Sequence, residues 1–396
     1  MYVHFPYCLA KCPYCDFVSY SSSRETIDGK GYADAVLLEL AGRAGGATGR
    51  IVSSVFFGGG TPSLWEPREL GRVVHAVRST LDVIDEGGAS RTASSSPAAT
   101  LEVTVECNPS SLDDRQASSL ANVGVNRLSI GVQSLREDRL RYLGRLHDGD
   151  GARRAVRAAM NSGAARVSAD FIFGLPGQTP DDARREVLEL VELGLTHLSC
   201  YQLTIEPGTR FGELARRGRL PLADEGAVAE SYAAVQDALE ANGLRHYEVS
   251  NYALPGDECR HNLGYWHGDE YLGLGCAAVG FLLRQEPNEP GCRRSGVRWR
   301  NHASPRAYVE QTQANETEEL DAETLMRERI MLGLRLDSGV DIDEAAKDLG
   351  AEGWTEERER AAHKLERCDR LVRERGRIRI PKHAWLWTDA IARDLI

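Results

Sequence analysis

The sequence predicts an α/β fold in which six β/α repeats form a partial, TIM-like barrel, followed by a smaller C-terminal domain that is mainly helical or winged-helix-like. Short runs rich in β-branched and aromatic residues alternate with helical patterns, which is typical of β/α units. Polar and glycine-rich residues follow these runs, where a parallel barrel places its ligand sites. A chain of 396 residues also exceeds one typical domain, which indicates an additional smaller unit.

The six predicted strands are short and end in polar residues. They cover residues 2–5, 51–57, 101–106, 126–130, 167–172 and 197–202. The predicted helices have apolar residues at helical spacing and cover residues 32–41, 69–81, 112–121, 151–162, 180–193 and 225–242. Residues 87–100, between the second helix and the third strand, are rich in Gly, Ser and Ala and are predicted to form a flexible surface insertion.

The repeat pattern ends near residue 245, so we expect a barrel core over residues 1–245. Residues 246–305 form a Gly- and aromatic-rich extension, and residues 306–396 a C-terminal helical domain with a β-hairpin at 371–381. The mildly basic stretch within this tail is interpreted as a solvated face.

Composition narrows the class of protein. A formal net charge of −11 disfavours a nucleic-acid partner. No run approaches the roughly 18 apolar residues that span a bilayer, and no apolar segment precedes the first cysteines. The nine cysteines suggest no disulfide framework, which favours a reducing compartment. We expect a cytoplasmic protein, with peripheral membrane attachment as the alternative.

Three cysteines near the start of the chain form a C-x3-C-x2-C motif, at Cys8, Cys12 and Cys15. Three thiolates can hold a [4Fe–4S] cluster and leave one iron open. An open iron can be chelated by a small molecule, as the radical chemistry of S-adenosylmethionine requires. A zinc site or a disulfide pair is the alternative, but no second C-x2-C unit is present.

Polar residues at the ends of neighbouring strands form the second candidate group. The glycine run 58–60 leaves backbone N–H groups open to a ligand carboxylate and carbonyl groups open to an amine. Acidic and amide side chains at the next strand ends can bind ammonium or ribose hydroxyl groups. These candidates are Gly59, Gly60, Thr61, Glu106, Gln133 and Asp170.

Arg145 follows a predicted helix, and two interpretations remain equally open. Its guanidinium can bind a ligand carboxylate through two parallel hydrogen bonds. It can also serve only as a cation at a helix C-terminus.

Several longer motifs together resemble the oxygen-independent coproporphyrinogen III oxidase-like branch of the radical SAM superfamily. They are YVHFPYC-x3-CPYCDF, FFGGGTPS, GVNRLSIGVQS, LGRLH, DFIFGLPGQT and HYEVSNYA, and they span nearly the whole chain. The resemblance implies a radical SAM barrel in which Cys8, Cys12 and Cys15 hold a [4Fe–4S] cluster. It further implies an S-adenosylmethionine site built from Tyr2, Tyr14, Gly59, Gly60, Thr61, Glu106, Gln133, Arg145 and Asp170, with Tyr14 beside the adenine.

Two features separate members of this branch. The decarboxylating oxidases have a further cysteine two residues after the third cluster ligand, where this chain has Phe17. Residues 260–266 read RHNLGYW and resemble the HNxxYW signature of the heme-chaperone subfamily. The resemblance therefore implies that the protein binds heme through His261 and passes it to respiratory apoproteins, with weaker candidates at His267 and His246.

The same resemblance implies three cofactors or cargoes, a [4Fe–4S] cluster, S-adenosylmethionine and heme. The implied partners are heme-accepting respiratory proteins and a reductant such as flavodoxin or ferredoxin, and a homodimer is an open alternative. A coproporphyrinogen III dehydrogenase of heme biosynthesis is the alternative function, and a radical enzyme acting on another porphyrin is a third.

One departure from the branch lies at residues 273–280, GLGCAAVG, where relatives usually read GxGPGAHS. Val279 stands where the histidine is expected. The role of that histidine is therefore lost, or Cys276 replaces it in part, since a thiolate can also ligate heme iron.

Overall fold

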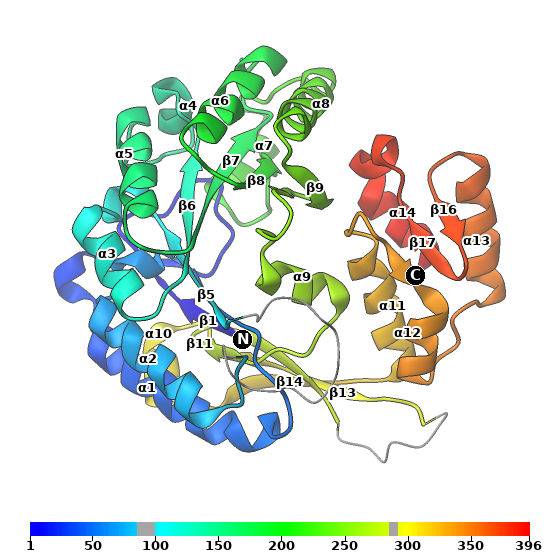
Figure 1. Cartoon of the computed structure of the whole chain (residues 1–396), viewed down its shortest axis with the longest axis horizontal. Coiled ribbons are helices and arrows are strands. Elements are labelled where there is room, and N and C mark those ends of the chain that lie inside the picture. The colour runs from blue at the N-terminus through cyan, green and yellow to red at the C-terminus, as the bar shows by residue number, and fades with distance from the viewer. Residues whose placement is uncertain (85–99, 285–291) are drawn as a thin grey trace.

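The computed structural model describes residues 1–84, 100–284 and 292–396. A nine-stranded sheet forms its centre (Figure 1). In chain order its strands are β1 (Tyr2–Phe5), β4 (Ser54–Gly59), β5 (Glu102–Cys107), β6 (Arg127–Gln133), β7 (Arg166–Phe173), β8 (His197–Gln202), β9 (Arg245–Glu248), β10 (Asn251–Ala253) and β11 (Gly273–Gly275). Their order in space is β11-β1-β4-β5-β6-β7-β8-β10-β9.

All strands from β11 to β8 run parallel, and β10 and β9 add an antiparallel pair at one edge. The prediction of an α/β fold with six β/α repeats is confirmed by β1 and β4 to β8. The strands β9, β10 and β11 were not predicted, because they follow the last β/α repeat and lie outside the repeat pattern. The predicted insertion at residues 87–100 lies, except for Thr100, outside the described residues.

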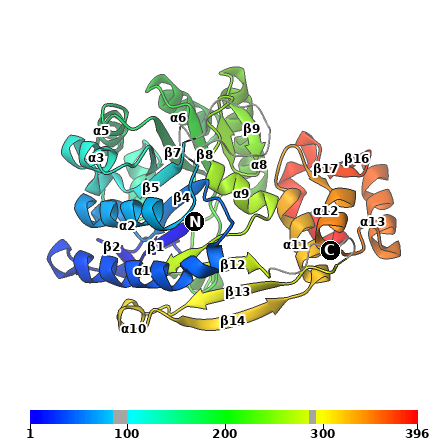
Figure 2. The same cartoon turned by 60° about the horizontal axis from the view of Figure 1, so that its bottom comes forward.

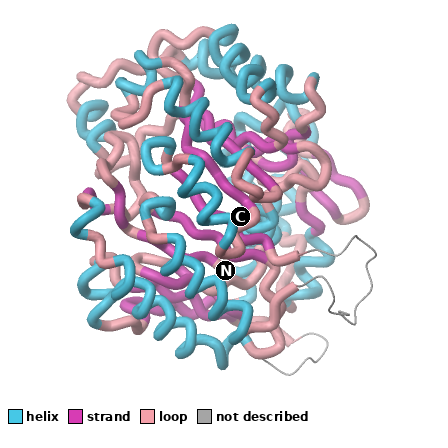
Figure 3. The backbone as a smooth tube through the Cα atoms, turned by 60° about the vertical axis from the view of Figure 1, so that its left-hand side comes forward, coloured by secondary structure: helices cyan, strands magenta, loops and turns pink. Residues whose placement is uncertain are grey.

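Helices cover the outer face of the sheet, as Figure 3 shows for the strands enclosed by helices. They are α1 (Gly29–Arg43), α2 (Pro67–Thr80), α3 (Asp114–Asn122), α4 (Glu137–Tyr142), α5 (Gly149–Met160), α6 (Pro180–Glu192), α7 (Arg210–Arg216) and α8 (Glu225–Ala241). Short 3₁₀ turns lie at Arg24–Thr26, Ala44–Ala47, Pro62–Leu64, Pro109–Ser111 and Lys382–Trp387.

Side-chain caps fix where several helices begin. The carboxylates of Asp113, Asp148 and Asp224 accept N–H groups of the first turn of α3, α5 and α8. Thr179 and Asp182 form a reciprocal capping box at the start of α6. These local contacts explain why each of these helices starts within about two residues of the position predicted from apolar spacing.

The two faces of the barrel strands differ in chemistry, because successive side chains point to opposite faces. Val55 and Phe57 of β4 and Val103 of β5 belong to the apolar core under the helices. On the other face, Ser54 of β4 and Glu102 of β5 are buried polar residues, whereas Phe56 of β4 stacks on His261. The inner face of the barrel therefore combines polar side chains with aromatic rings.

A three-stranded antiparallel sheet runs below the barrel toward the C-terminal domain (Figure 2). Its strands are β12 (Val279–Leu283), β13 (Gly296–Asn301) and β14 (Ala314–Leu320), and α10 (Pro305–Glu310) lies between the last two. A short parallel pair, β2 (Tyr7–Cys8) and β3 (Tyr20–Ser21), brackets the cysteine loop.

The C-terminal domain has its own apolar core. It contains α11 (Ala322–Gly333), α12 (Ile342–Leu349), α13 (Glu356–Arg367) and α14 (Thr388–Leu395), and a small sheet of β15 (Val340–Asp341), β17 (Arg377–Arg379) and β16 (Val372–Glu374). The predicted C-terminal hairpin is confirmed by the antiparallel pairing of β16 with β17. None of the described helices is long and apolar enough to cross a membrane.

Candidate functional site

The three cysteines of the C-x3-C-x2-C motif follow the C-terminal end of β1. Cys8 ends β2, and Cys12 and Cys15 lie on the loop between β2 and β3. Cys8 is buried, and Cys12 and Cys15 are half-buried free thiols. The N–H of Cys15 donates to the carbonyl of Cys12 at 3.1 Å, which closes a tight turn. Thr61 donates its hydroxyl to the Cys8 sulfur at 3.4 Å. We call this loop, together with the strand ends beside it, the cysteine rim.

The donor set of the cysteine rim suits an iron–sulfur cluster. Burial raises the pKa of Cys8 and of Cys15. A neighbouring cysteine of the motif raises each pKa further. Thiols that interact in this way release protons when a metal binds them. Among the described residues, no three His, Cys, Asp or Glu side chains are already gathered as a metal site. The rim thus supplies soft thiolate ligands close to one another, which come together as a metal site when the metal binds.

The glycine run at the end of β4 brings two loops into close contact. A Cβ atom on Gly60 would lie 2.6 Å from the carbonyl oxygen of Tyr7, so only glycine fits there. The N–H of Gly60 donates to Phe5 at 2.7 Å, and the N–H of Thr61 to Tyr7 at 2.8 Å. The N–H of Gly59 donates to the Glu106 carboxylate at 3.1 Å. The expectation that the glycine run leaves its N–H groups open to a ligand is wrong for Gly59 and Gly60, because the protein itself binds both groups.

Two acids face the interior of the barrel. Burial raises the pKa of Glu106 to about 8, and the nearby Asp170 adds to the shift. Burial raises the pKa of Asp170 to about 6, although bonding by Ser199 opposes it. Both side chains keep some accessible surface. A bound cation or hydroxyl group would stabilise the ionised form of both carboxyl groups and lower their pKa values.

Gln133, at the end of β6, has a left-handed backbone with φ of 64°. This conformation is uncommon for a residue other than glycine and is often found at ligand sites. Gln133 is half-buried at the same end of the barrel as Glu106 and Asp170.

Arg145 lies against the cysteine rim rather than acting only at the end of a helix. Its guanidinium donates to the Cys12 sulfur at 3.5 Å and to the Gly131 carbonyl at 2.8 Å. Its buried Nε has no partner among the described residues. The Tyr14 phenol adjoins Arg145, and burial raises its pKa. The structure thus brings Tyr14 and Arg145 together beside a candidate cluster ligand.

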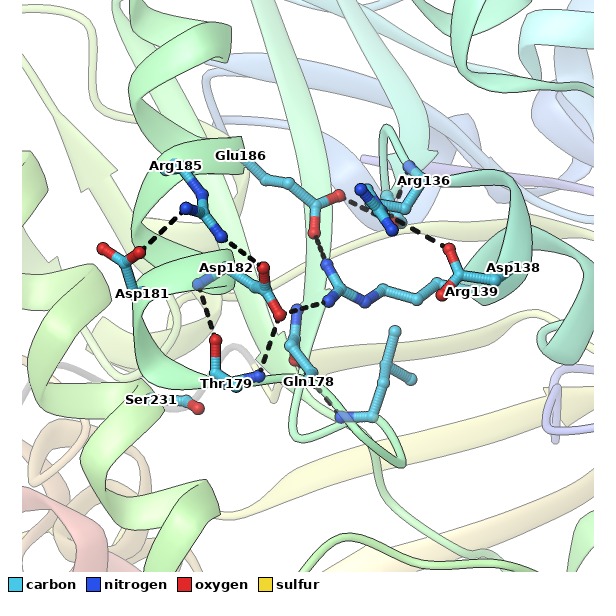
Figure 4. Close-up of polar contacts among 12 residues, drawn as sticks. Arg136, Asp138, Arg139, Gln178, Thr179, Asp181, Asp182, Arg185, Glu186 and Ser231 are labelled. Carbon is cyan, nitrogen blue, oxygen red and sulfur yellow. Dashed lines mark hydrogen bonds and ion pairs between the residues drawn. The ribbon is translucent and has the colours of Figure 1, made fainter.

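A buried ion pair holds the segment that carries Gln133 and Arg145. The carboxylate of Glu186 on α6 accepts hydrogen bonds from Arg139 and from the N–H of Leu135, the latter at 2.6 Å. Arg139 also donates to Asp182 at 2.8 Å (Figure 4). Arg139 and Glu186 are only 5% exposed. The sequence does not predict this pair, because charged residues on a helix usually form a solvated face.

Tyr2 and His4 form a further buried contact at the base of the cysteine rim. The Tyr2 hydroxyl lies 3.0 Å from His4 Nδ1, and His4 Nε2 lies 2.8 Å from the Val18 carbonyl. Burial lowers the pKa of His4 to about 4, so its ring is neutral near pH 7. The neutral ring donates to Val18 and accepts from Tyr2, which ties the end of the cysteine loop to β1.

His261 lies on α9 (Arg260–His267), against the N-terminal ends of β4 and β5. Its ring stacks on Phe56 with centroids 4.7 Å apart, and Nδ1 lies 3.2 Å from the Ser54 hydroxyl. Burial lowers its pKa, so the imidazole is neutral. Its Nε2 is buried and has no hydrogen-bond partner among the described residues. A neutral imidazole with one free nitrogen is a suitable metal ligand.

Glu102 fixes α9 in place. Its carboxylate accepts the N–H of Arg260 at 3.2 Å and that of His261 at 3.1 Å, and it pairs with Arg166 at 2.7 Å. Burial disfavours its charge, but Arg127 and Arg166 hold its pKa below the usual range. An anion at a helix N-terminus is stabilised by the unpaired N–H groups there. Neither Glu102 nor Ser54 was identified from the sequence, because their role appears only when distant segments pack.

A cavity of about 320 Å³ adjoins this histidine, and Ser54, Arg260, Tyr265 and Tyr271 are among its lining residues. We call it the histidine cavity. Ser54 and Gly59 are the first and last residues of β4. At about 3.3 Å per residue, these two residues lie about 17 Å apart along the strand.

The His261 ring reaches the middle of β4, where it stacks on Phe56, and its centroid lies 6.3 Å from that of the Tyr2 ring. The candidate cluster and the candidate heme ligand therefore lie toward opposite ends of the barrel, and Tyr2 contacts both His261 and His4 of the cysteine rim.

The structure does not bring the other candidate heme ligands to His261. The Cys276 thiol donates to the Ala303 carbonyl at 2.7 Å, beyond the C-terminal end of β11. His246 stacks on Tyr252 with centroids 4.2 Å apart, and His267 is exposed at the end of α9. Val279 begins β12 and pairs with Arg300.

Comparisons with known proteins show which family and which fold this chain resembles. The Radical SAM superfamily model matches residues 2–191, and the HemN C-terminal domain model matches residues 320–387. A heme chaperone HemW from Escherichia coli is 38% identical over 71% of this chain and 69% of that protein. A heme chaperone HemW from Mycobacterium tuberculosis is 34% identical over 100% of this chain and 94% of that protein.

A solved structure shows the same fold. The coproporphyrinogen III oxidase HemN from Escherichia coli, described as a radical SAM enzyme, has a TM-score of 0.78 at 19% identity. The alignment covers 100% of this chain and 89% of that chain.

Proposed function

Because the chain belongs to the heme chaperone HemW family within the radical SAM superfamily, we propose that it binds a [4Fe–4S] cluster, S-adenosylmethionine and heme. It would hold the first two at the cysteine rim and the heme at the opposite end of the barrel. It would then pass the heme to respiratory apoproteins.

At the cysteine rim, Cys8, Cys12 and Cys15 would ligate the cluster and leave one iron for S-adenosylmethionine. The cluster supplies an electron when it is reduced, for which flavodoxin or ferredoxin is the proposed donor. Hydrogen bonds from Thr61 to Cys8 and from Arg145 to Cys12 already point at two of the sulfurs. Such bonds stabilise added negative charge on a cluster.

The S-adenosylmethionine site would use the polar groups that surround the barrel interior. Glu106 and Asp170 offer carboxylates for an ammonium or ribose hydroxyl, and Tyr14 offers a ring beside the adenine. The remaining contacts would come from Tyr2, Gly59, Gly60, Thr61, Gln133 and Arg145. Because the N–H groups of the glycine run are bound internally, its carbonyl groups are the better candidates for ligand contacts.

The unpartnered Nε2 of His261 carries the heme proposal. Ser54 fixes Nδ1, Phe56 fixes the ring plane, and a cavity lies beside the ring. A buried nitrogen without a hydrogen-bond partner destabilises the fold. Its presence here is consistent with a ligand that binds this nitrogen.

The test is an anaerobic titration of the purified protein with hemin. His261→Ala should weaken binding at least tenfold and shift the Soret band, because iron loses its axial imidazole. His267→Ala, on the exposed end of the same helix, is the matched control and should bind like wild type. Unchanged affinity and an unchanged spectrum for His261→Ala would contradict the ligand assignment.

Phe17 makes the oxidase alternative the weaker one. It stands where the oxidases have a further cysteine, and its side chain is 60% exposed. Anaerobic incubation with coproporphyrinogen III, S-adenosylmethionine and reductant should give less than one equivalent of decarboxylated product. Repeated turnover would show an oxidase instead of a chaperone.

A further inference from the structure

A second cavity of about 310 Å³ lies between the barrel and the C-terminal domain. Its walls come from the end of α9, from β12 and β13, and from α11 and α12. Figure 1 shows α9 beside α11 and α12 near the centre right. It shares Tyr265, Asp269 and Tyr271 with the histidine cavity. We call it the interdomain cavity.

The walls of the interdomain cavity are mostly apolar. Phe281, Leu325, Leu332 and Leu349 line it together with the two tyrosines. The first, second and fourth of these belong to the core of the C-terminal domain, so the walls are well fixed. Burying apolar ligand surface against such walls supplies most of the binding free energy of a hydrophobic ligand.

One cation on this wall is available for an anionic group. Arg329 lines the interdomain cavity and makes no ion pair within 4.0 Å among the described residues. Arg329 interacts electrostatically with Asp269, whose pKa is raised by burial, while His267 and Arg329 act to lower it. Arg298, on the same wall, is instead paired with Glu328 at 2.5 Å. Arg329 is therefore the cation that can bind a carboxylate without first breaking an ion pair.

The Tyr265 ring divides the two cavities. It meets the His261 ring edge-on with centroids 4.9 Å apart, and it meets the Tyr271 ring at 4.7 Å. Aromatic edge contacts of this kind are worth about 1 kcal/mol, so a ligand that stacks on the ring can displace them. Each cavity alone is at the lower limit of ligand pockets, which range over about 300–1,000 Å³.

We propose that the histidine cavity and the interdomain cavity are two halves of one porphyrin site, joined when Tyr265 turns aside. The apolar edge of the macrocycle packs between the barrel and the C-terminal domain, and Arg329 binds a propionate. This inference rests on the proposed heme function and adds the C-terminal domain as a wall of the site.

The first test compares hemin with its dimethyl ester, which lacks the propionate charges. Arg329→Gln should weaken hemin binding about tenfold and leave the affinity for the ester within twofold of wild type. Arg327→Gln, on the exposed face of the same helix, is the control and should change neither affinity. Equal losses for hemin and ester, or no loss for either, would overturn the role of Arg329.

The second test fills the interdomain cavity and uses metal-free protoporphyrin, which needs no axial ligand. Leu332→Trp should weaken the binding of both hemin and protoporphyrin at least tenfold, whereas His261→Ala should affect only hemin. Leu38→Trp, at a side chain 66% exposed on α1, is the control. Circular dichroism and thermal unfolding confirm that each variant is folded, and Arg329→Gln provides the test that needs no bulky substitution.

The outcomes separate the two proposals. If wild type binds hemin through His261 but Leu332→Trp and Arg329→Gln bind it normally, the two-cavity site is wrong and the heme proposal stands. If folded wild type binds neither hemin nor protoporphyrin, both proposals are wrong.

Discussion

The two ends of the barrel are built in different ways. The cysteine rim takes its three thiols from eight consecutive residues, and the loops around it hold it through backbone hydrogen bonds. The end that carries His261 is assembled from distant segments, since the bond from Ser54 to His261 joins positions 207 residues apart. The rim can therefore be recognised from a local motif, whereas the histidine end exists only once the whole barrel has folded.

The largest effect is expected at Glu102, which anchors the histidine end. Glu102→Gln removes the charge that pairs with Arg166 and that also offsets the buried charge of Arg127. Breaking one side of a buried charge pair should lower the free energy of unfolding by about 3–5 kcal/mol, measured by urea titration. Glu318→Gln, in an exposed pair with Arg298, should cost less than about 1 kcal/mol. Equal costs at the two positions would contradict the anchoring role.

A smaller effect is expected at Glu186, which supports the cysteine rim from α6. Glu186→Gln keeps the side-chain shape but weakens the contacts with Arg139 and Leu135, at a cost of about 2–3 kcal/mol. Reconstitution with iron and sulfide should also yield fewer than the roughly four irons per chain expected for one cubane. Glu189→Gln is the control, because it removes only a half-exposed ion pair with Arg153. This variant should retain its full iron content.

The barrel interior should make stability depend on pH. The folded pKa of Glu106 is about 8, above its unfolded value, so the folded state binds more protons between about pH 4.5 and pH 8. Glu106 alone should therefore make the free energy of unfolding fall as pH rises through this range. Buried histidines act in the opposite direction, because the folded pKa of His4 is about 4, below its unfolded value of 6.5. The difference in free energy of unfolding between wild type and Glu106→Gln isolates the carboxyl, and from pH 5 to pH 8 it should change in the direction that disfavours wild type. A difference that stays constant over this range would show that Glu106 is charged in the folded protein.

The smallest effect is expected at Ser54, which orients the His261 ring. Ser54→Ala removes the partner of Nδ1 while Phe56 still holds the ring plane. Hemin affinity should fall about threefold to tenfold, as expected for one hydrogen bond of about 1 kcal/mol, and the iron content should not change. Loss of the cluster in this variant would show that the two ends of the barrel are coupled.

Sequence patterns predicted the parallel part of the fold well. Each of the six strands alternates or is continuously apolar over a short run, and the observed ends lie within three residues of the predicted ones. The edge strands β9 to β11 and the sheet of β12 to β14 were missed. Their short or charged sequences carry little periodicity, as in β14, which reads ANETEEL and is mostly exposed. Pairing with a distant strand decides their structure.

The candidate site divides in the same way. The cysteines and the acids at strand ends could be proposed from local order, because parallel strands place their C-terminal ends together. Glu186, Glu102 and Ser54 could not, since each is an ordinary polar residue until a segment far along the chain packs against it. The glycine run was interpreted as a ligand-binding backbone, but its close contact with the Tyr7 carbonyl depends on tertiary structure.

The separation of the two ends is tested most directly by hemin titration of a protein that cannot hold the cluster. In a variant with Cys8, Cys12 and Cys15 all changed to Ser, His261, Ser54 and the histidine cavity are untouched. The variant should lack iron after reconstitution and bind hemin with a Kd within twofold of the cluster-loaded wild type. A loss of tenfold or more in hemin affinity, in a variant that remains folded, would show that heme binding depends on the cysteine rim and would contradict two separate sites.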